Sequence, residues 1–340
     1  MLWTLWSLWA ATPALAEDFV VDFLDVGQGD SVLIRGAGRS VLIDAGTRDA
    51  NVLGQLKQLG VRQLDLVVAT HPHADHIGGL GDVLAGMPVK LFVDSGQEHT
   101  TKAWERVTTT LADRNIRRVR AKPDMTFGLG DEATLTVLWP AEQLLKDTRS
   151  DLNSNSVVLW LDHGEIDALF TGDAEDPTER ALMRAGLEEV ELLKVAHHGS
   201  GHSSSSAFLQ RVSPEIAVVS CGLDNRYGHP DPETLQRLQS AGAMVFRTDQ
   251  SGHVRAVSTG TELDVLEGTI EMFRSLPSPE QASVPSDIPL LKLPEESPSD
   301  APATAASPVD SASLSGVRQS TFVDDEPIGK RKKRNRRGSP

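Results

Sequence analysis

Three histidines and one aspartate lie within six residues, directly after an apolar run that predicts a buried strand. They are His71, His73, Asp75 and His76. Imidazole and carboxylate groups are the ligands that zinc and similar divalent metals prefer. His71 and His73 are two residues apart in an extended loop, so both can reach one ion, whereas Asp75 and His76 point elsewhere and suit a second ion. The segment therefore predicts a site for two divalent metal ions.

Further candidate ligands follow other predicted strands. Asp173 comes directly after the strand that ends near Thr171, and a carboxylate with two oxygens can bridge two cations. His197 and His198 end the next strand. Adjacent side chains diverge, so we expect one of them to bind metal and the other to face the substrate; the sequence does not distinguish them. His229 lies in a loop before a predicted helix, where it could donate a hydrogen bond to a phosphate oxygen or complete the metal shell.

Several residues are candidates for supporting roles. Asp44 ends an earlier strand, either as a turn former or as a carboxylate that orients the histidines of the metal loop. Ser200 precedes a serine-rich run that either lines a substrate groove or forms a flexible loop. Gly78 and Gly79 are expected to let the backbone turn sharply beneath the ligands. Cys221 follows an apolar strand and is interpreted as a buried filler rather than a nucleophile.

Composition restricts the chemistry. The chain contains one cysteine among 340 residues, which excludes an intrachain disulfide and leaves His, Asp and Asn to build the metal site. The formal net charge of −15 argues against general binding of polyanions, so any contact with nucleic acid requires a local patch. One basic cluster could meet an anionic substrate or could form a solvated face; it comprises Arg114, Arg117, Arg118 and Arg120.

The order of predicted elements indicates how these residues are positioned. Three short strands joined by glycine turns between residues 19 and 44 predict an antiparallel meander. The strand at 64–69 leads into the metal loop, and a second β-rich half begins at residue 133. Each half is flanked by helical patterns. We therefore predict an α/β fold, a four-layer αββα sandwich, over residues 17–272.

The two ends of the chain differ from this domain. Residues 1–16 are apolar and end in an A-x-A pattern, which predicts an export signal cleaved after Ala16 and a secreted or periplasmic protein. No Lys or Arg precedes the apolar run, so a hydrophobic anchor or a misassigned start is the alternative. Residues 273–340 are rich in Pro, Ser and Ala and are predicted to be disordered. Their basic end, 330–337, suits a tether to DNA, an anionic polymer or a membrane surface, or a solubilising tail.

The metal loop resembles the H-x-H-x-D-H signature of the metallo-β-lactamase superfamily. More narrowly, the chain resembles the metallo-β-lactamase-like domain of the competence DNA-uptake channel family (ComEC/Rec2) over about residues 19–265; pneumococcal-type phosphorylcholine esterase carries a similar domain. The motifs that carry this resemblance occur in order, at Asp25–Ser31, His71–Gly79, Asn155–Leu159, Thr171–Asp173, Lys194–Ser200 and Tyr227–Pro230. It implies the αββα fold, two metal ions (usually zinc, sometimes manganese) and phosphodiester hydrolysis.

The resemblance also implies roles for individual residues. It places His71 and His73 on one ion and Asp75 and His76 on the other. The same pattern makes Asp173 the bridging ligand, adds one of His197 and His198 to the second ion, and matches Asp44 to the first motif of the superfamily.

The sequence departs from the superfamily at one ligand. The usual separate histidine between the metal loop and the bridging aspartate has no match, because His99 and His163 lack its context. Asn155 is expected to take its place, as in the competence subfamily. This substitution predicts a weaker shell around the first ion.

The resulting prediction is an exported dinuclear-metal hydrolase that acts on DNA or another phosphodiester. An activated water attacks phosphorus, Asp75 or Asp173 accepts a proton, and His229 with the non-ligating histidine stabilises charge on the phosphoryl oxygens. Two alternatives use the same residues: hydrolysis of an acyl ester, lactone or thioester, and a weakly metal-binding module without catalysis. The sequence makes no prediction of the oligomeric state.

Overall fold

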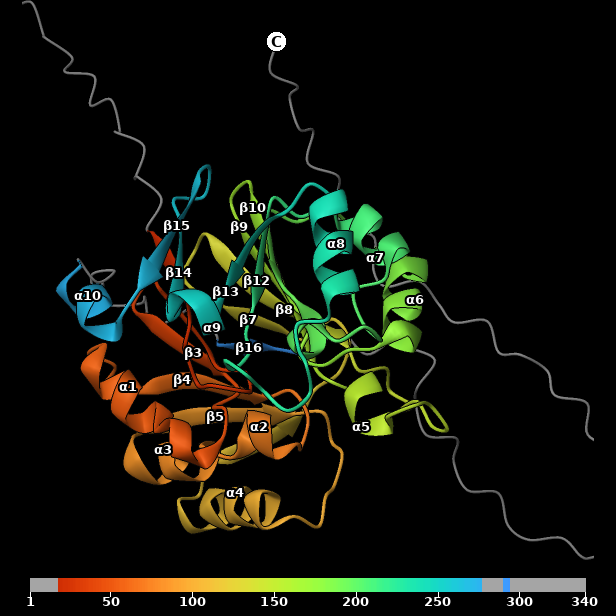
Figure 1. Ribbon diagram of the computed structural model, residues 1–340. Coiled ribbons are helices and arrows are strands. Elements are labelled where there is room, and N and C mark those ends of the chain that lie inside the picture. The colour runs from red at the N-terminus through yellow and green to blue at the C-terminus, as the bar shows by residue number, and fades with distance from the viewer. Residues whose placement is uncertain (1–17, 277–289, 294–340) are drawn as a thin grey trace, which may run out of the picture.

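A computed structural model describes residues 18–276 and 290–293, which form two eight-stranded sheets packed face to face with helices outside (Figure 1). The first sheet has the order β15 (Leu263–Gly268), β14 (His253–Ser258), β1 (Phe19–Phe23), β2 (Val32–Gly36), β3 (Arg39–Ile43), β4 (Leu64–Ala69), β5 (Val89–Asp94) and β6 (Arg117–Arg120). The second has the order β13 (Met244–Arg247), β12 (Ile216–Val219), β11 (Leu192–Lys194), β10 (Ile166–Phe170), β9 (Val158–His163), β8 (Ala133–Trp139), β7 (Thr126–Gly128) and β16 (Leu291–Lys292).

Helices cover the outer face of each sheet, so the predicted four-layer αββα sandwich is confirmed (Figure 1). Against the first sheet pack α1 (Val52–Gln58), α3 (Leu80–Gly86), α4 (Lys102–Asp113) and α10 (Ile270–Ser275). Against the second pack α6 (Asp176–Arg184), α7 (Ser206–Val212) and α8 (Pro232–Ser240). The remaining helices are short: 3-10 turns η1 (Arg48–Ala50) and η2 (Ala196–Gly199), and α2 (Ala74–Ile77), α5 (Asp151–Ser154) and α9 (Thr248–Ser251).

Side chains alternate between two cores along each strand. On β3, Val41 faces the core between the sheets, while Leu42 faces the helices of the first sheet. On β10, Phe170 faces the same central core and Leu169 faces the helices of the second sheet. Alternation with a period of two is the geometry of an extended strand. Burial on both faces explains why these strands are almost continuously apolar in the sequence.

The outer helices show the complementary pattern. On α4, Trp104, Val107 and Leu111 recur at helical spacing and are buried against the first sheet. The hydroxyl of Thr101 accepts a hydrogen bond from the Trp104 amide and caps the helix. An apolar stripe with a capping residue in front of it is sufficient to define this helix from the sequence.

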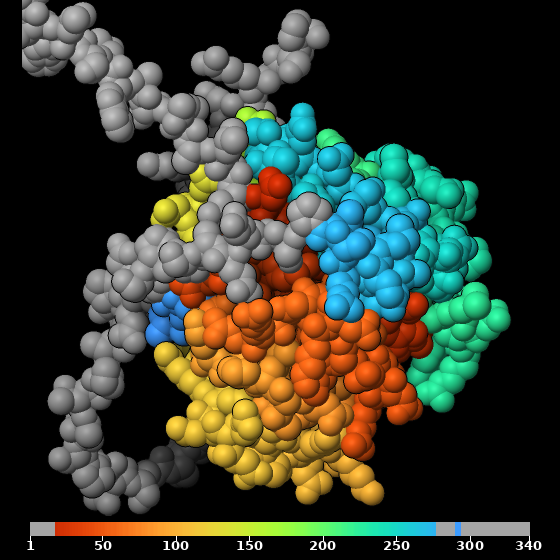
Figure 2. All heavy atoms as spheres, turned by 90° about the vertical axis from the view of Figure 1, so that its left-hand side faces the viewer, coloured from red at the N-terminus to blue at the C-terminus, as the bar shows by residue number. Residues whose placement is uncertain are grey.

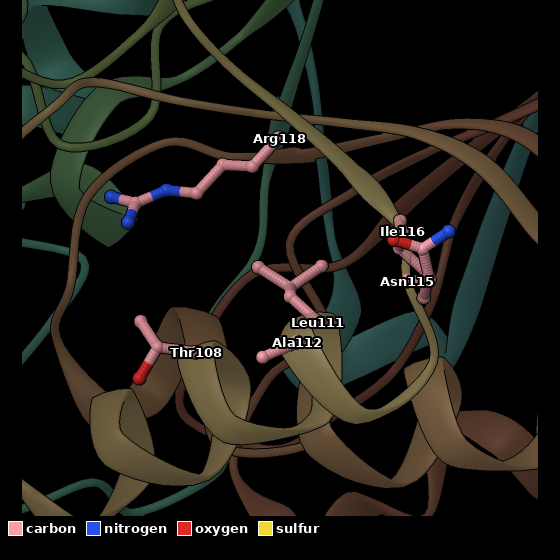
Figure 3. Close-up of a pocket in the computed structure, with 6 residues that line it drawn as sticks. All are labelled: Thr108, Leu111, Ala112, Asn115, Ile116 and Arg118. Carbon is pink, nitrogen blue, oxygen red and sulfur yellow. The ribbon is translucent and has the colours of Figure 1, made fainter.

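The basic cluster that the sequence singled out forms part of the fold. Arg117–Arg120 is the edge strand β6, and charged side chains on an edge strand discourage pairing with other chains. Arg118 bonds to Asp94 at 2.5 Å and lies over the Trp104 ring. It also lines a small pocket between α4 and β6, with Thr108, Leu111, Ala112, Asn115 and Ile116 (Figure 3). None of these residues is a predicted ligand.

The end of the domain lies further along the chain than predicted. Helix α10 crosses the expected boundary at residue 272, because Ile270 and Phe273 bury apolar side chains in the core that α1 also lines. Figure 2 shows the blue segment that contains α10 packed against the orange N-terminal part of the chain. Strand β16 then pairs with β7, so the prediction of disorder is wrong at Leu291–Lys292. Leu290 and Leu291 pack against the central core. The predicted export signal at 1–16 and the basic cluster at 330–337 lie outside the described residues. Within the described ranges, no helix has the length and apolarity needed to cross a membrane.

Candidate metal centre

The candidate ligands lie in loops that follow strands of both sheets. Strands β3 and β4 are parallel neighbours in the first sheet, and β10, β11 and β12 are parallel neighbours in the second. Because their carboxyl ends point the same way, the loops that leave them meet at one edge. Two backbone hydrogen bonds hold this edge together. Val157, just before β9, donates to the Thr70 carbonyl at 2.9 Å, and His197 donates to the Gly172 carbonyl at 3.1 Å.

Two groups of ligand-type side chains form there and share one carboxylate. The first cluster is His71, His73 and Asp173, and the second cluster is Asp30, His76, Asp173 and His198. Within each cluster, the candidate ligand atoms lie within 4.8 Å of one another. Asp173 contributes to both, which is the geometry that the predicted bridging role requires. The structure thus brings together residues that are separated by up to 127 positions in the predicted set, from His71 to His198.

In the second cluster, partners behind each imidazole fix its orientation. Nδ1 of His76 lies 2.8 Å from Oδ2 of Asp44, and Nδ1 of His198 lies 3.0 Å from the Ser220 carbonyl oxygen. Because the carbonyl oxygen can only accept, Nδ1 of His198 carries the proton. Both Nε2 atoms are therefore directed towards Asp173, with the His76 atom 3.2 Å from Oδ1. Asp44 thus occupies the orienting position that was one of its two predicted roles.

The second cluster passes a simple test for a cation. Nε2 of His76, Nε2 of His198 and Oδ1 of Asp173 are buried, and none has a hydrogen-bond partner among the described residues. Buried polar atoms without partners are costly, so their convergence needs an explanation. Two nitrogen lone pairs and a carboxylate oxygen suit a divalent transition metal. The residues therefore fit such an ion, although they do not identify it as zinc.

Asp30 is a member of the second cluster that the sequence analysis did not select. Its oxygens lie 3.1 Å from Nδ1 of His198 and 3.7 Å from Nδ1 of His76. It therefore approaches both rings at Nδ1, on the side away from Asp173. Lys194, also buried, forms an ion pair with Asp30 and balances its charge.

The first cluster has fewer members and different partners. Nε2 of His71 lies 2.9 Å from Nδ1 of His73 and 3.7 Å from Oδ2 of Asp173. On its other side, Nδ1 of His71 meets two hydroxyls, Thr70 at 3.1 Å and Ser156 at 3.3 Å. His99 lies nearby, with its ring centroid 6.5 Å from that of His73, but it does not belong to the cluster.

Asn155 does not occupy the position that the resemblance implied. Its amide oxygen accepts from the Leu145 amide, and its amide nitrogen donates to the carbonyls of Leu145 and Asp151. Both ends of the side chain thus close the preceding loop. The neighbouring Ser156 is the residue from this segment that reaches the centre, since its hydroxyl also accepts from the Asp173 amide at 3.3 Å.

The remaining predicted residues lie at the open side of the centre. Asp75 has a side chain that is 29% exposed, and its Oδ2 lies 3.5 Å from Nε2 of His198. His197 is half-buried, with Nε2 3.7 Å from Oδ2 of Asp173 and Nδ1 3.6 Å from Glu175. The His229 ring lies 5.6 Å from the His197 ring. The His197/His198 ambiguity resolves geometrically: His198 belongs to a ligand cluster, and His197 faces the rim with His229.

Two predicted details differ in the structure. Ser200 is buried in the turn after η2, where its hydroxyl accepts from the His202 amide instead of facing the clusters. Gly78 and Gly79 both have negative φ, so they do not provide a sharp turn. A Cβ on Gly79 would lie 2.3 Å from the Ala45 carbonyl oxygen. The glycine is required because α2 packs tightly against the loop after β3.

Backbone conformation marks the same residues. His197, His198 and Asp44 have φ values of 51°, 54° and 57°, in the left-handed region that side chains other than glycine rarely adopt. Such conformations cost free energy and persist where the surroundings impose them, often at functional sites. The turn at His197–His198 directs the His198 ring towards the second cluster and the His197 ring towards the open side of the centre.

The pKa values of the histidines are shifted in opposite directions in the two clusters. Burial would lower the pKa of His198, but Asp173 and Asp30 raise it to about 9. The pKa of His76 is also raised well above its usual value, because Asp173, Asp44 and Asp30 outweigh its burial. In contrast, burial and the neighbouring His76 hold the pKa of His71 well below its usual value.

Known proteins resemble this chain in sequence and fold. The family profile described as "Metallo-beta-lactamase superfamily" matches residues 24–223. ComE operon protein 3 of Bacillus subtilis is 32% identical over 266 residues, which cover 72% of this chain and 33% of that protein. Competence protein ComA of Neisseria gonorrhoeae is 33% identical over 249 residues, which cover 69% of this chain and 32% of that protein.

The chain thus spans about a third of the length of these curated relatives, and the predicted resemblance to competence proteins is confirmed. Among solved structures, Igni18, a metallo hydrolase from the archaeon Ignicoccus hospitalis, is 15% identical with a TM-score of 0.46; the match covers 74% of this chain and all of that one.

Proposed function

Because the chain belongs to the metallo-beta-lactamase superfamily, we propose that it is a metal-dependent phosphodiesterase whose substrate is DNA or another phosphodiester. The observation that carries the proposal is the sharing of Asp173 between two ligand clusters. Two cations held on either side of one carboxylate suit an in-line displacement at phosphorus. The relative named competence protein ComA, together with the resemblance to the competence DNA-uptake channel family, favours a nucleic acid over other phosphodiesters.

The bound cations would activate a water molecule and polarise the phosphoryl group. Around them, Asp75 is a partly exposed carboxylate beside His198 and is positioned to accept a proton from that water. Burial would raise the pKa of Asp75, but the neighbouring imidazoles of His198 and His76 hold it below its usual value, so Asp75 is ionised at neutral pH.

His197 and His229 contribute hydrogen-bond donors on the open side. Burial, together with His197 and His198, lowers the pKa of His229 to about 4, so its ring is neutral at pH 7 and donates through one N–H. A neutral imidazole can donate a hydrogen bond to a phosphoryl oxygen without adding a positive charge beside the cations. Glu175 lies beside Nδ1 of His197 and orients that ring.

A substrate panel tests the proposal. The purified full chain, with its metal content measured, is incubated with single-stranded and double-stranded DNA, bis(p-nitrophenyl) phosphate, an aryl ester and a lactone. We expect cleavage of a phosphodiester, and we expect His71→Ala and His198→Ala to reduce its rate by about a hundredfold or more, since each removes a metal ligand. His202→Ala, which removes an exposed histidine outside both clusters, is the control.

The outcomes separate the alternatives. A chain that retains its metal and cleaves only the ester or lactone is an acyl hydrolase. A chain that cleaves nothing while holding fewer than one ion per molecule is a binding module. Either result rejects the phosphodiesterase.

We further propose that the protein acts outside the cytoplasm, on the basis of the apolar segment 1–16 and its A-x-A end. The basic segment 330–337 would then attach the domain to an anionic polymer or membrane surface. N-terminal sequencing of the exported protein tests the first statement: a mature chain that begins at Glu17 supports it, and a chain that retains Met1 contradicts it.

A further inference from the structure

The loop between β12 and α8, residues 220–231, presents apolar and cationic side chains beside the metal centre. Leu223 is 71% exposed and Tyr227, the only tyrosine in the chain, is 52% exposed. Arg226 is exposed as well. An exposed aromatic ring and an exposed guanidinium both offer a flat face on which a base can stack.

Three side chains of this loop form a column that leads outwards from the metal centre. The rings of His229 and Tyr227 stack at 5.8 Å with an interplanar angle of 23°. The Arg226 guanidinium lies over the Tyr227 ring at 4.7 Å and donates to its hydroxyl at 2.6 Å. At the inner end, the His229 ring lies 6.4 Å from the ring of His198, a residue of the second cluster.

The loop is braced, so the column is preformed. The Asn225 side chain accepts from the amides of Tyr227 and His229 and donates to the Gly222 carbonyl. Gly222 packs against the loop between β1 and β2, where a Cβ would lie 2.6 Å from the Gln28 amide nitrogen. A platform that is already ordered loses less conformational entropy when a ligand binds to it.

The charge of the molecule favours stacking as the mode of recognition. The formal net charge of −15 repels a polyanion over long distances, so contacts with phosphates alone supply little affinity. Stacking of a base on an aromatic or guanidinium plane does not depend on net charge and tolerates any sequence. It also requires a base outside a duplex, because the neighbouring base pairs of a duplex cover both faces of each base.

We propose that Tyr227 and Arg226 form a base-stacking platform that selects single-stranded DNA for the phosphodiesterase proposed above. A base next to the scissile phosphodiester stacks on the column in place of the exposed guanidinium, which moves to a phosphate. The column then sets the distance between that base and the ions. The inference rests on the proposed function for its substrate, and its test separates the two.

Binding is measured with two single-stranded 12-mers that carry the same charge and resist cleavage because their backbones are phosphorothioates. One is oligothymidine, and the other has abasic sites throughout. The metal-loaded full chain should bind oligothymidine about tenfold more tightly, which is the contribution of stacking one base. Tyr227→Leu should abolish this preference, Tyr227→Phe should retain it, and Arg226→Gln should weaken both oligomers equally.

Leu266→Ala removes an exposed apolar side chain from β15, away from the loop, and serves as the control for lost apolar surface. Because Tyr227 and Arg226 are exposed, all variants should keep the melting temperature of the wild type. Equal binding of both oligomers by the wild type, no measurable binding of either, or a preference that survives in Tyr227→Leu overturns the platform.

Cleavage of ordinary oligothymidine is followed in parallel. A base preference in a chain that cleaves no phosphodiester upholds the platform and rejects the phosphodiesterase. Cleavage without a base preference upholds the phosphodiesterase and rejects the platform.

Discussion

The two halves of the metal centre share Asp173 but are supported in different ways. Behind the two histidines of the second cluster lie two carboxylates, Asp44 and Asp30, and Asp30 is paired with a buried lysine, Lys194. Behind His71 in the first cluster, the described residues supply the hydroxyls of Thr70 and Ser156 instead. The second is buried throughout, whereas His73 in the first is partly exposed.

This difference predicts unequal affinities. Carboxylates behind a ligating histidine fix the ring and increase its basicity, and hydroxyls do so less. The first cluster also has only three ligand-type residues in the described part of the chain, one of which is shared. We therefore expect the second cluster to hold its ion tightly and the first to exchange its ion with solvent. The following predictions test this inequality.

The largest effect is expected from Asp173→Ala. This substitution removes the only carboxylate common to both clusters and leaves two histidines in the first. We expect the purified variant to lose both ions, measured as metal per chain by elemental analysis after dialysis. Asp264→Ala, at an exposed position on β15, should retain the wild-type content. A variant at position 173 that keeps one ion at full occupancy would show that the two clusters are independent.

The pH dependence of metal binding provides the second test. In the metal-free protein, Asp173 and Asp30 raise the pKa of His198 to about 9 despite its burial, so this ring carries a proton at pH 7 that an ion must displace. The pKa of His76 is raised well above its usual value as well, so an ion must displace a proton from each ring. Affinity of the second cluster should therefore rise about a hundredfold per pH unit between pH 6 and 8. Burial lowers the pKa values of His71 and His73, so the first cluster has no proton to lose and its affinity should stay constant.

Cobalt(II) titrations against a competing chelator at pH 6, 7 and 8 measure this difference by absorbance. The class of site that disappears in His73→Ala identifies the first cluster. Equal slopes for both classes would contradict the electrostatic distinction between the two halves.

Much of this centre was predictable because its ligands obey local rules. The H-x-H-x-D-H segment and Asp173 each follow an apolar strand, and parallel strands bring such ends together. The choice between His197 and His198 was not predictable. It depends on two consecutive left-handed residues, and no local sequence pattern specifies that conformation for histidine.

Asp30 and Asn155 illustrate a second limit. Asp30 lies in a glycine-rich turn that the sequence singled out, but its partner Lys194 is 164 positions away. Burial of such a pair is a tertiary property that a one-dimensional pattern does not carry. Asn155 showed the opposite error. The order of the motifs suggested that Asn155 is a ligand. Its side-chain amide instead forms hydrogen bonds with the backbone of residues 145 and 151. The adjacent Ser156 contacts His71 in the metal centre.

The smallest and most specific effect is expected from Asp30. If Asp30 orients His198 and His76 from behind, removing its charge should weaken the second ion by about ten- to a hundredfold and leave the first unchanged. Asp30→Asn alone leaves Lys194 buried without its partner, which costs about 3–5 kcal/mol of stability. The informative variant is therefore Asp30→Asn with Lys194→Met, compared with the single substitution by thermal unfolding of the metal-free proteins.

The double variant should be the more stable of the two and should still show the weakened second ion. If it binds that ion as tightly as the wild type, Asp30 serves only to neutralise Lys194. If it loses the ion altogether, as Asp173→Ala should, then Asp30 is a direct ligand, and the two halves of the centre differ in the number of their ligands more than in the support behind them.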